Sequence, residues 1–296
     1  MTFFNRAACF TDIHFGNKNN SKQHNRDCSE FVDWFIEQSK DCETCIFLGD
    51  WHHHRASVNV STLNHSVENV TLVEDALVKD DVALIPWLVG DEWKTLQKTK
   101  CRYMFGHFEL PYFKMNAMVE MPDHGGINAE HLISPEYVFT GHFHKRQNKG
   151  NVHYLGSPFG HNYADTWDDD RGMMKLSWGG TPEYIDFDGP RYRTVPLSRL
   201  IDEPDKILNG KTYCRATLDI NISYEEASFI KETFSQQYSV REITLMPSKK
   251  EEHAQDWKVV DDIEVENVDQ IVYNSLNAVD SDMIDKKILV DIYNSL

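Results

Sequence analysis

The first fifty residues alternate between short apolar runs and one amphipathic segment. Residues 6–11 and 45–48 have the length and apolar content of buried strands. Between them, residues 24–40 place apolar side chains at helical spacing, namely Cys28, Phe31, Val32, Phe35 and Ile36. The opening therefore predicts strand, helix, strand, which is typical of an α/β fold with its site at the strand ends.

Apolar runs that end in polar turns predict that strands dominate the middle of the chain. These runs are residues 82–87, 102–105, 137–140, 153–155 and 173–178. A strand at 213–220, a helix at 224–237 and a strand at 240–246 then form a βαβ pattern. We therefore expect a main domain over 1–200 and a small α/β accessory domain over 201–247.

The C-terminal segment differs in composition from the rest. Residues 248–256 are polar and aperiodic, as expected of a linker, and 257–296 hold two helical patterns at 268–279 and 282–293. Residues 251–296 carry twelve acidic and three basic side chains, a net charge of −9, which leaves −8 of the total −17 for the first 250 residues. Because much of the acidity is confined to this tail, it does not exclude a nucleic-acid substrate. The apolar faces of the tail either pack on the main domain or dock on a partner.

Cysteine usage and hydropathy indicate the compartment. Six cysteines are scattered through 296 residues, which favours reduced thiols over a disulfide framework. Cys42 and Cys45 form a lone CxxC without a second ligand pair, so we do not expect a zinc site there. No apolar run reaches the roughly 18 residues of a membrane helix. We expect a soluble cytoplasmic protein without membrane contact.

Four short motifs, each directly after a predicted strand, combine carboxylates with imidazoles. Two are pairs at i and i+2, which extended backbone directs to one face. The candidate metal ligands are Asp12, His14, Asp50, His107, His142 and His144. Mixed Asp and His ligands without thiolates suit manganese, iron or zinc better than magnesium or calcium. The pattern predicts a site for two divalent metal ions, most suited to manganese, that activates water for phosphoester hydrolysis.

Longer strings around these motifs carry a resemblance to a known family. They are YMFGHFEL at 103–110, FTGHFHKR at 139–146, NVHYLGSP at 151–158 and DDDRG at 168–172. With the motif order DxH, GD, GH, GHxH, the chain resembles the calcineurin-like metallophosphoesterase superfamily. Within it, the chain is most similar to SbcD-type DNA double-strand-break repair nucleases, a branch that includes the recombination endonuclease subunits of tailed phages. The resemblance implies a layered sandwich of two mixed sheets flanked by helices, and an enzyme of the cytoplasm of phage-infected bacteria.

The resemblance also implies how the ligands divide. It gives Asp12, His14, Asp50 and His144 to one metal ion, and Asp50, His107 and His142 to the other, with Asp50 bridging. It also places His53, three residues after Asp50, beside the site as a catalytic histidine. The alternative for His53, as for its neighbours His52 and His54, is a solvated loop imidazole.

The chain departs from the family in one motif. Relatives carry an Asn-His pair after a glycine, in which Asn completes the second metal site and His acts as acid or transition-state stabiliser. Here the segment between Asp50 and His107 is shorter by several tens of residues than in relatives, and that motif is absent. The nearest candidates are Asn64 as a metal ligand and His65 as a catalytic residue. Alternatively, both lie on a surface helix.

Four further side chains are candidates for substrate binding or for lining the cleft. Lys145 and Arg146 directly follow the GHFH motif and are placed to contact DNA phosphate, although they are equally typical of surface cations. His124, within PDHGG, and His161, after GSPFG, lie in loops of a kind that lines such clefts.

Three functions follow from this pattern and resemblance. The first is a manganese-dependent DNA exo- or endonuclease that processes DNA ends in recombination and repair. Its implied partners are DNA, an SbcC-like SMC-type ATPase bound through the tail, and a second copy of the chain in a homodimer. The second is a catalytically impaired scaffold of the same ATPase complex, because the Asn-His motif is missing. The third is a metallophosphatase for a small phosphoester.

Overall fold

The computed structural model describes residues 2–54, 73–116 and 119–247. They belong to one compact unit, Met1–Ser248. The predicted linker at 248–256, the helical tail at 257–296, Asn64 and His65 lie outside the described residues.

Strands outnumber helices along the described chain. The elements in order are β1 (Arg6–Phe10), α1 (Asn17–Asn20), α2 (Lys22–Gln38), β2 (Thr44–Phe47), β3 (Leu77–Lys79), β4 (Val82–Leu84), η1 (Glu92–Lys98), β5 (Tyr103–His107), η2 (Ala129–Leu132), β6 (Tyr137–Gly141), β7 (Gln147–Lys149), β8 (Val152–Tyr154), η3 (Tyr163–Asp165), β9 (Gly172–Ser177), β10 (Glu183–Asp186), β11 (Arg191–Pro196), α4 (Leu197–Asp202), α5 (Pro204–Ile207), β12 (Thr212–Leu218), α6 (Tyr224–Tyr238) and β13 (Glu242–Pro247).

Most predicted elements appear within a few residues of their expected ends. Helix α2 begins two residues before the predicted 24–40 because the side chain of Ser21 accepts a hydrogen bond from the His24 amide and caps the helix. The strand predicted at 82–87 ends at Leu84. Pro86 follows closely and has no amide proton to donate to a neighbouring strand.

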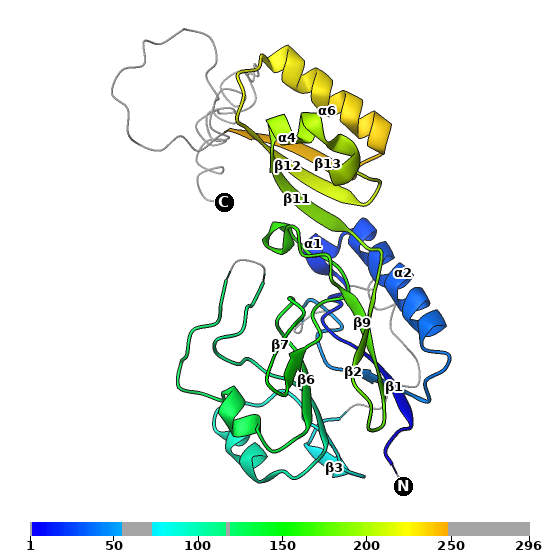
Figure 1. The fold of residues 1–296 in the computed structure, drawn as a ribbon, viewed down its shortest axis with the longest axis vertical. Helices are drawn as coiled ribbons and strands as arrows, with labels where there is room; N and C mark the ends of the chain where they lie inside the picture. The colour runs from blue at the N-terminus through cyan, green and yellow to red at the C-terminus, as the bar shows by residue number, and fades with distance from the viewer. Residues whose placement is uncertain (1, 55–72, 117–118, 248–296) are drawn as a thin grey trace, which may run out of the picture. The chain divides into compact units, whose positions relative to one another are not determined.

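The described residues form three sheets, and Figure 1 labels many of their strands. A four-stranded sheet has the order β10-β9-β1-β2, and a six-stranded sheet has the order β3-β4-β5-β6-β8-β7. In the first, β1 and β2 are parallel and β9 and β10 are antiparallel to their neighbours. In the second, β4, β5, β6 and β8 are parallel, and both edge strands are antiparallel. The mixed α/β class predicted from the sequence is confirmed.

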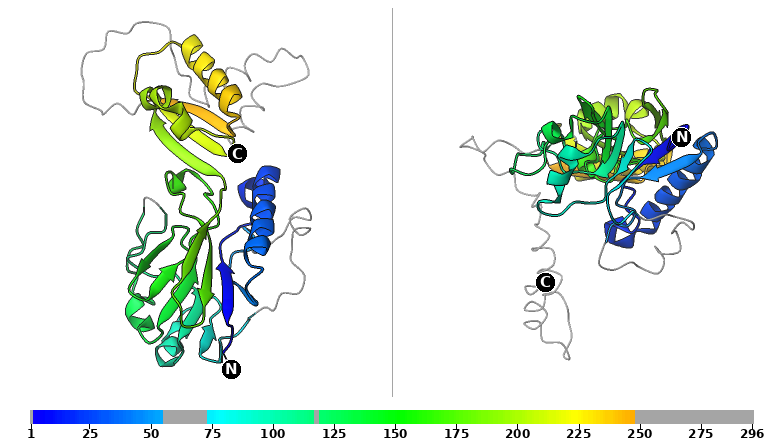
Figure 2. Two further views of the ribbon diagram at one scale, coloured as in Figure 1. Left: turned by 45° about the vertical axis from the view of Figure 1, so that its right-hand side comes forward. Right: turned by 90° about the horizontal axis from the view of Figure 1, so that it is seen from below.

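Alternate side chains of β1 pack against two different layers of the fold. Ala7 and Cys9 face the six-stranded sheet, in a cluster with residues of β4, β5 and β6. Ala8 and Phe10 face the other way, toward Phe31 of α2. The two sheets therefore pack face to face, and α2 covers the outer face of the four-stranded sheet (Figure 2).

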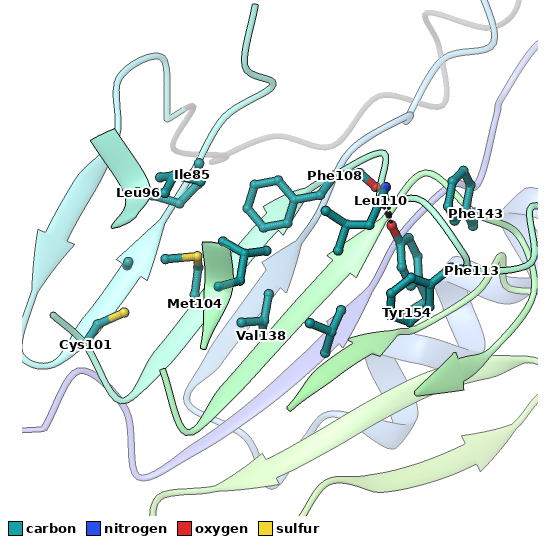
Figure 3. Close-up of a cluster of buried hydrophobic side chains, with 13 residues drawn as sticks. Ile85, Leu96, Cys101, Met104, Phe108, Leu110, Phe113, Val138, Phe143 and Tyr154 are labelled. Carbon is teal, nitrogen blue, oxygen red and sulfur yellow. Dashed lines mark hydrogen bonds between the residues drawn. The ribbon is translucent and has the colours of Figure 1, made fainter. Parts of the chain in front are cut away.

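Strand β5 repeats this alternation in the six-stranded sheet. Tyr103 and Phe105 face the four-stranded sheet, whereas Met104 faces the opposite side. On that side lies a third cluster, drawn in Figure 3, in which Tyr154 is fully buried. Its hydroxyl donates to the carbonyl of Phe108 at 2.8 Å and accepts from the amide of Leu110 at 3.1 Å (Figure 3). These hydrogen bonds attach residues 108–110, which follow β5, to the apolar core.

A three-stranded parallel sheet, β11-β12-β13, carries its own apolar cluster with α4, α5 and α6. It includes the predicted βαβ pattern of β12, α6 and β13. Strand β11 also belongs to this sheet, and it begins at Arg191, ten residues before the boundary predicted at 201. Arg241 joins this part of the chain to α2 through two hydrogen bonds to the carboxylate of Asp27, at 2.6 and 2.7 Å.

Within the described ranges, no helix is both long enough and apolar enough to cross a membrane.

Candidate metal centre

The candidate ligands lie at or just beyond the carboxyl ends of β1, β2, β5 and β6. The loops after β1 and β2 are joined by backbone hydrogen bonds: the Asp12 amide donates to the Gly49 carbonyl and the His14 amide to the Asp50 carbonyl, each at 2.9 Å. Strands β5 and β6 pair in parallel, with His107 opposite Gly141. These pairings gather residues far apart in sequence at one edge.

Four of the candidate ligands have a left-handed backbone. The φ angles are 52° for Asp12, 55° for His14, 57° for Asp50 and 87° for His142. Such angles are uncommon for residues other than glycine and cluster at functional sites, where the surrounding structure offsets the strain. All four residues lie just beyond the carboxyl end of a strand.

Close approach to these turns requires a glycine at position 141. A Cβ atom there would lie 2.1 Å from Thr11 Oγ1, 2.7 Å from His107 Nδ1 and 2.8 Å from Asp12 Oδ2. No side chain fits in that space. The glycine of the GHFH motif therefore allows β6 to meet the loop after β1.

One group of potential ligands consists of Asp12, His14 and His144, whose ligand atoms lie within 4.8 Å of one another. The Nε2 atoms of His14 and His144 are 3.2 Å apart. Without a metal ion, this contact is an imidazole hydrogen bond. The distance is also near the value of about 3.3–3.4 Å expected for two nitrogens bound to one tetrahedral ion.

A second group consists of Asp12, Asp50 and His107. The Nδ1–H of His107 donates to the Leu48 carbonyl at 2.9 Å, which leaves the lone pair on Nε2. That Nε2 is buried without a hydrogen-bond partner and lies 3.8 Å from Asp12 Oδ1 and 3.7 Å from Asp50 Oδ2. Both distances are too long for a hydrogen bond.

These features fit a metal ion. A buried imidazole lone pair that faces two carboxylates without bonding to either needs a cation or a proton between them. His107 also has the outer hydrogen bond to a backbone carbonyl that is usual for a metal-bound imidazole. The buried Asp and His side chains therefore can bind a metal ion.

Asp12 belongs to both groups, whereas the resemblance names Asp50 as the shared ligand. The structure also places Asp50 between the two histidines, with its Oδ2 3.7 Å from Nε2 of both His14 and His107. Asp12 Oδ1 lies 3.9 and 3.8 Å from the same two nitrogens. Both carboxylates thus lie between the imidazoles.

The predicted ligand His142 belongs to neither group of described residues. Its backbone amide donates to Asp12 Oδ2 at 3.0 Å, and its Nε2 lies 3.9 Å from Oε2 of Glu109. We did not predict a role for Glu109. The sequence does contain a signal, because Glu109 follows His107 at i+2, the same spacing that marks the other ligand pairs.

Outside the two groups, three buried side chains hold the ligands in place. His24 Nε2 donates to the His14 carbonyl, and His161 Nε2 donates to the Asp12 carbonyl, each at 3.0 Å. Arg171 donates through Nη1 to the His144 carbonyl at 2.7 Å. His161 was a candidate cleft residue, but it is 1% exposed, so it supports the backbone instead of lining an open cleft.

Burial and neighbouring charges together set the pKa values of the site histidines. Burial, with the neighbouring His144, lowers the pKa of His14 to about 4. Burial also lowers the pKa of His107, but the carboxylates of Asp50 and Asp12 raise it, and the net shift is upward. Burial and the neighbouring His107 lower the pKa of His142. His14 and His142 are therefore neutral near pH 7, the state in which an imidazole binds a metal ion.

Four other candidate residues lie outside the two ligand groups. His53 is exposed beside the first group, with its ring centroid 5.4 Å from that of His14. His124 lines a pocket beside the second group. The two basic candidates form ion pairs, Lys145 with Asp168 at 3.0 Å and Arg146 with Asp186 at 2.5 Å.

Comparisons with protein families and with curated proteins found no match for this chain.

Proposed function

We propose that this chain is a metal-dependent DNA phosphodiesterase of the SbcD type, using two divalent metal ions, most suited to manganese. One observation carries the proposal: Asp50 Oδ2 lies 3.7 Å from the Nε2 atoms of both His14 and His107. A carboxylate midway between two imidazoles is suited to bridge two cations. Adjacent cations bridged in this way are the recurring arrangement of phosphoester-hydrolysing enzymes.

The layers of the fold support the proposal. A four-stranded and a six-stranded mixed sheet share an apolar interface, and α2 covers one outer face. The family resemblance implies such a sandwich. The candidate ligands leave the carboxyl ends of parallel strands, where α/β folds generally place their sites.

When bound, the two ions would polarise the phosphoryl oxygens and lower the pKa of the attacking water. The carboxylates of Asp12 and Asp50 offset the positive charge and hold the site together. Leu48 fixes the tautomer of His107 through its carbonyl. His53, exposed next to His14, is placed to donate a hydrogen bond to a substrate oxygen at the mouth of the site.

A second candidate function is the catalytically impaired scaffold. It is favoured by the position of His142, which faces Glu109 and joins neither ligand group of described residues. The missing Asn-His motif points the same way. A scaffold would keep the first group, Asp12, His14 and His144, and still bind the proposed ATPase through residues 257–296.

The partners are part of the proposal. They are DNA, an SbcC-like SMC-type ATPase at the tail, and a second copy of the chain. The tail is strongly acidic: residues 251–296 carry a net charge of −9, out of −17 for the whole chain. It is therefore less suited to DNA than to a basic protein surface.

Metal content and substrate choice test these functions together. Elemental analysis of the purified chain should show two divalent ions per chain, and Asp50→Asn should reduce that number. The exposed Asp202 supplies a matched control, Asp202→Asn, which should retain both ions.

Hydrolysis assays then separate the candidates. With manganese, and with and without the ATPase, we expect the chain to degrade linear DNA. Inertness toward both DNA and a chromogenic phosphodiester would overturn the nuclease and favour the scaffold. Turnover of the chromogenic ester alone would favour the small-molecule phosphatase, the third function considered from the sequence.

A further inference from the structure

A pocket of about 240 Å³ opens directly beside the second ligand group. His107 belongs to both: its Nε2 faces Asp12 and Asp50, and the residue also lines the pocket. The other lining residues include Trp87, Phe108, Glu109, Asp123 and His124. A substrate group bound here would be a direct neighbour of a phosphate at the metal centre.

Trp87 lines the pocket and also lies against two candidate metal ligands. Its ring centroid lies 5.6 Å from that of His107 and 5.2 Å from that of His142. The residue is 41% exposed. An indole that touches two candidate ligands and keeps much of its surface in water is placed to stack on a planar group.

The floor of the pocket is apolar and firmly held. Phe108 is 2% exposed and belongs to the cluster in Figure 3, against which Leu88, Met121 and Ile127 also pack. The Phe108 amide donates to Thr140 Oγ1 at 2.8 Å, which ties this floor to β6. A preformed apolar floor favours a flat, poorly hydrated ligand group.

Acidic side chains among the lining residues determine which part of a nucleic acid fits. Glu109 and Asp123 both line the pocket, and Asp123 is held by the Tyr112 hydroxyl at 3.2 Å and the Gly125 amide at 2.8 Å. Carboxylates repel backbone phosphates but accept hydrogen bonds from the amino and imino groups of bases. The pocket therefore suits a neutral base and disfavours the phosphate chain.

We propose that this pocket binds the nucleobase next to the phosphate at the metal centre, with the base stacked on Trp87. The inference rests on the proposed function, because that function places a nucleotide phosphate between the two ligand groups. The base must be unstacked from its neighbours to enter, so the pocket selects single-stranded or frayed DNA ends. It also gives His124 a role at the edge of a substrate subsite.

The test measures base stacking separately from hydrolysis. The probes are the 5′- and 3′-monophosphates of 2-aminopurine deoxynucleoside with manganese, because stacking on an indole quenches 2-aminopurine fluorescence. Wild-type protein should bind and quench one of them. Trp87→Ala should bind it about 5- to 150-fold more weakly, the range for loss of one base–aromatic stack, and Trp87→Phe, which keeps an aromatic ring, should retain most of the binding affinity.

Trp167 supplies a matched control, because it is 44% exposed and does not line the pocket. Trp167→Ala should quench like the wild type. Equal quenching by Trp87→Ala and wild type, or no quenching of either probe by wild type, would overturn the base pocket. Quenching that depends on Trp87 in a protein that cleaves no DNA would retain the pocket and remove the proposed nuclease activity.

Discussion

Replacement of Arg171 by Met should be among the most damaging single changes outside the ligands. Arg171 is 1% exposed, and its Nη2 lies 2.9 Å from both Asp165 Oδ1 and Asp168 Oδ2. It also donates to the carbonyl of His144 and to the hydroxyl of Ser157. One guanidinium thus offsets two buried carboxylates and supports the backbone of a candidate metal ligand.

The size of the effect follows from the burial of the three charges. The side chains of Arg171, Asp165 and Asp168 are 2%, 1% and 6% exposed. Removal of one member of a buried ion pair costs about 3–5 kcal/mol when the partner is left buried and uncompensated. Here that partner is Asp165, because Asp168 keeps its ion pair with Lys145 at 3.0 Å. Arg191 is the matched control: its pair with Asp188 is 37% and 69% exposed, so Arg191→Met should cost at most about 1 kcal/mol.

Urea unfolding of both variants measures these costs, and manganese titration reports on the site. Because the His144 carbonyl loses its donor in Arg171→Met, manganese should bind about tenfold more weakly, at the lower end of effects from support residues around a metal. The triple variant Asp165→Asn, Asp168→Asn, Arg171→Met should recover part of the stability. Equal stability of Arg171→Met and Arg191→Met would refute the claim that a buried charge cluster supports His144.

Two further predictions concern the backbone and the acid response of the site. Gly141→Ala should abolish tight manganese binding by titration, because its Cβ would overlap Thr11 Oγ1 at 2.1 Å, whereas Gly126→Ala meets open space and should bind like wild type. Burial lowers the pKa of His24 to about 4 and that of His161 well below 6.5, so the unfolded chain binds protons below pH 6.5 that the folded chain does not. Stability of the metal-free protein should therefore fall as pH drops from 6.5 toward 4, by about 1.4 kcal/mol per pH unit for each such histidine. Thermal melts from pH 7 to 5 check this, and a slope in His24→Gln as steep as in wild type would contradict it.

Local patterns in the sequence were sufficient to predict most of the secondary structure of the described residues. Period-two and helical spacing depend on which face of an element is buried, and that information is carried by neighbouring residues. The same locality explains why the ligand motifs could be found. Asp12 and His14, like His142 and His144, lie two residues apart beyond a strand, and parallel strands end at one edge.

Several elements escaped prediction because their partners are distant in sequence. Strands β3, β7 and β10 are edge strands of three or four residues that pair with a single neighbour, so their own pattern is short. Strand β11 belongs with β12 and β13 only through hydrogen bonds across the chain.

Tertiary structure alone decided how the ligands are shared and what surrounds them. Asp12 groups with His14 and His144 and also with His107 because loops from the two sheets lie close together. Glu109 lies beside His142 because β5 pairs with β6. Trp87 lies beside His107 because β4 pairs with β5. No spacing within the sequence encodes these separations.

The sequence by itself therefore determined which side chains have the chemistry to bind metal, because ligand type and position after a strand are local properties. Only the tertiary structure determined which of these side chains lie close together. It places Asp12 and Asp50 between the imidazoles of His14 and His107. The physical reason is that ligand geometry is set by the packing of one sheet on another, and that packing is the sum of contacts made across the whole core.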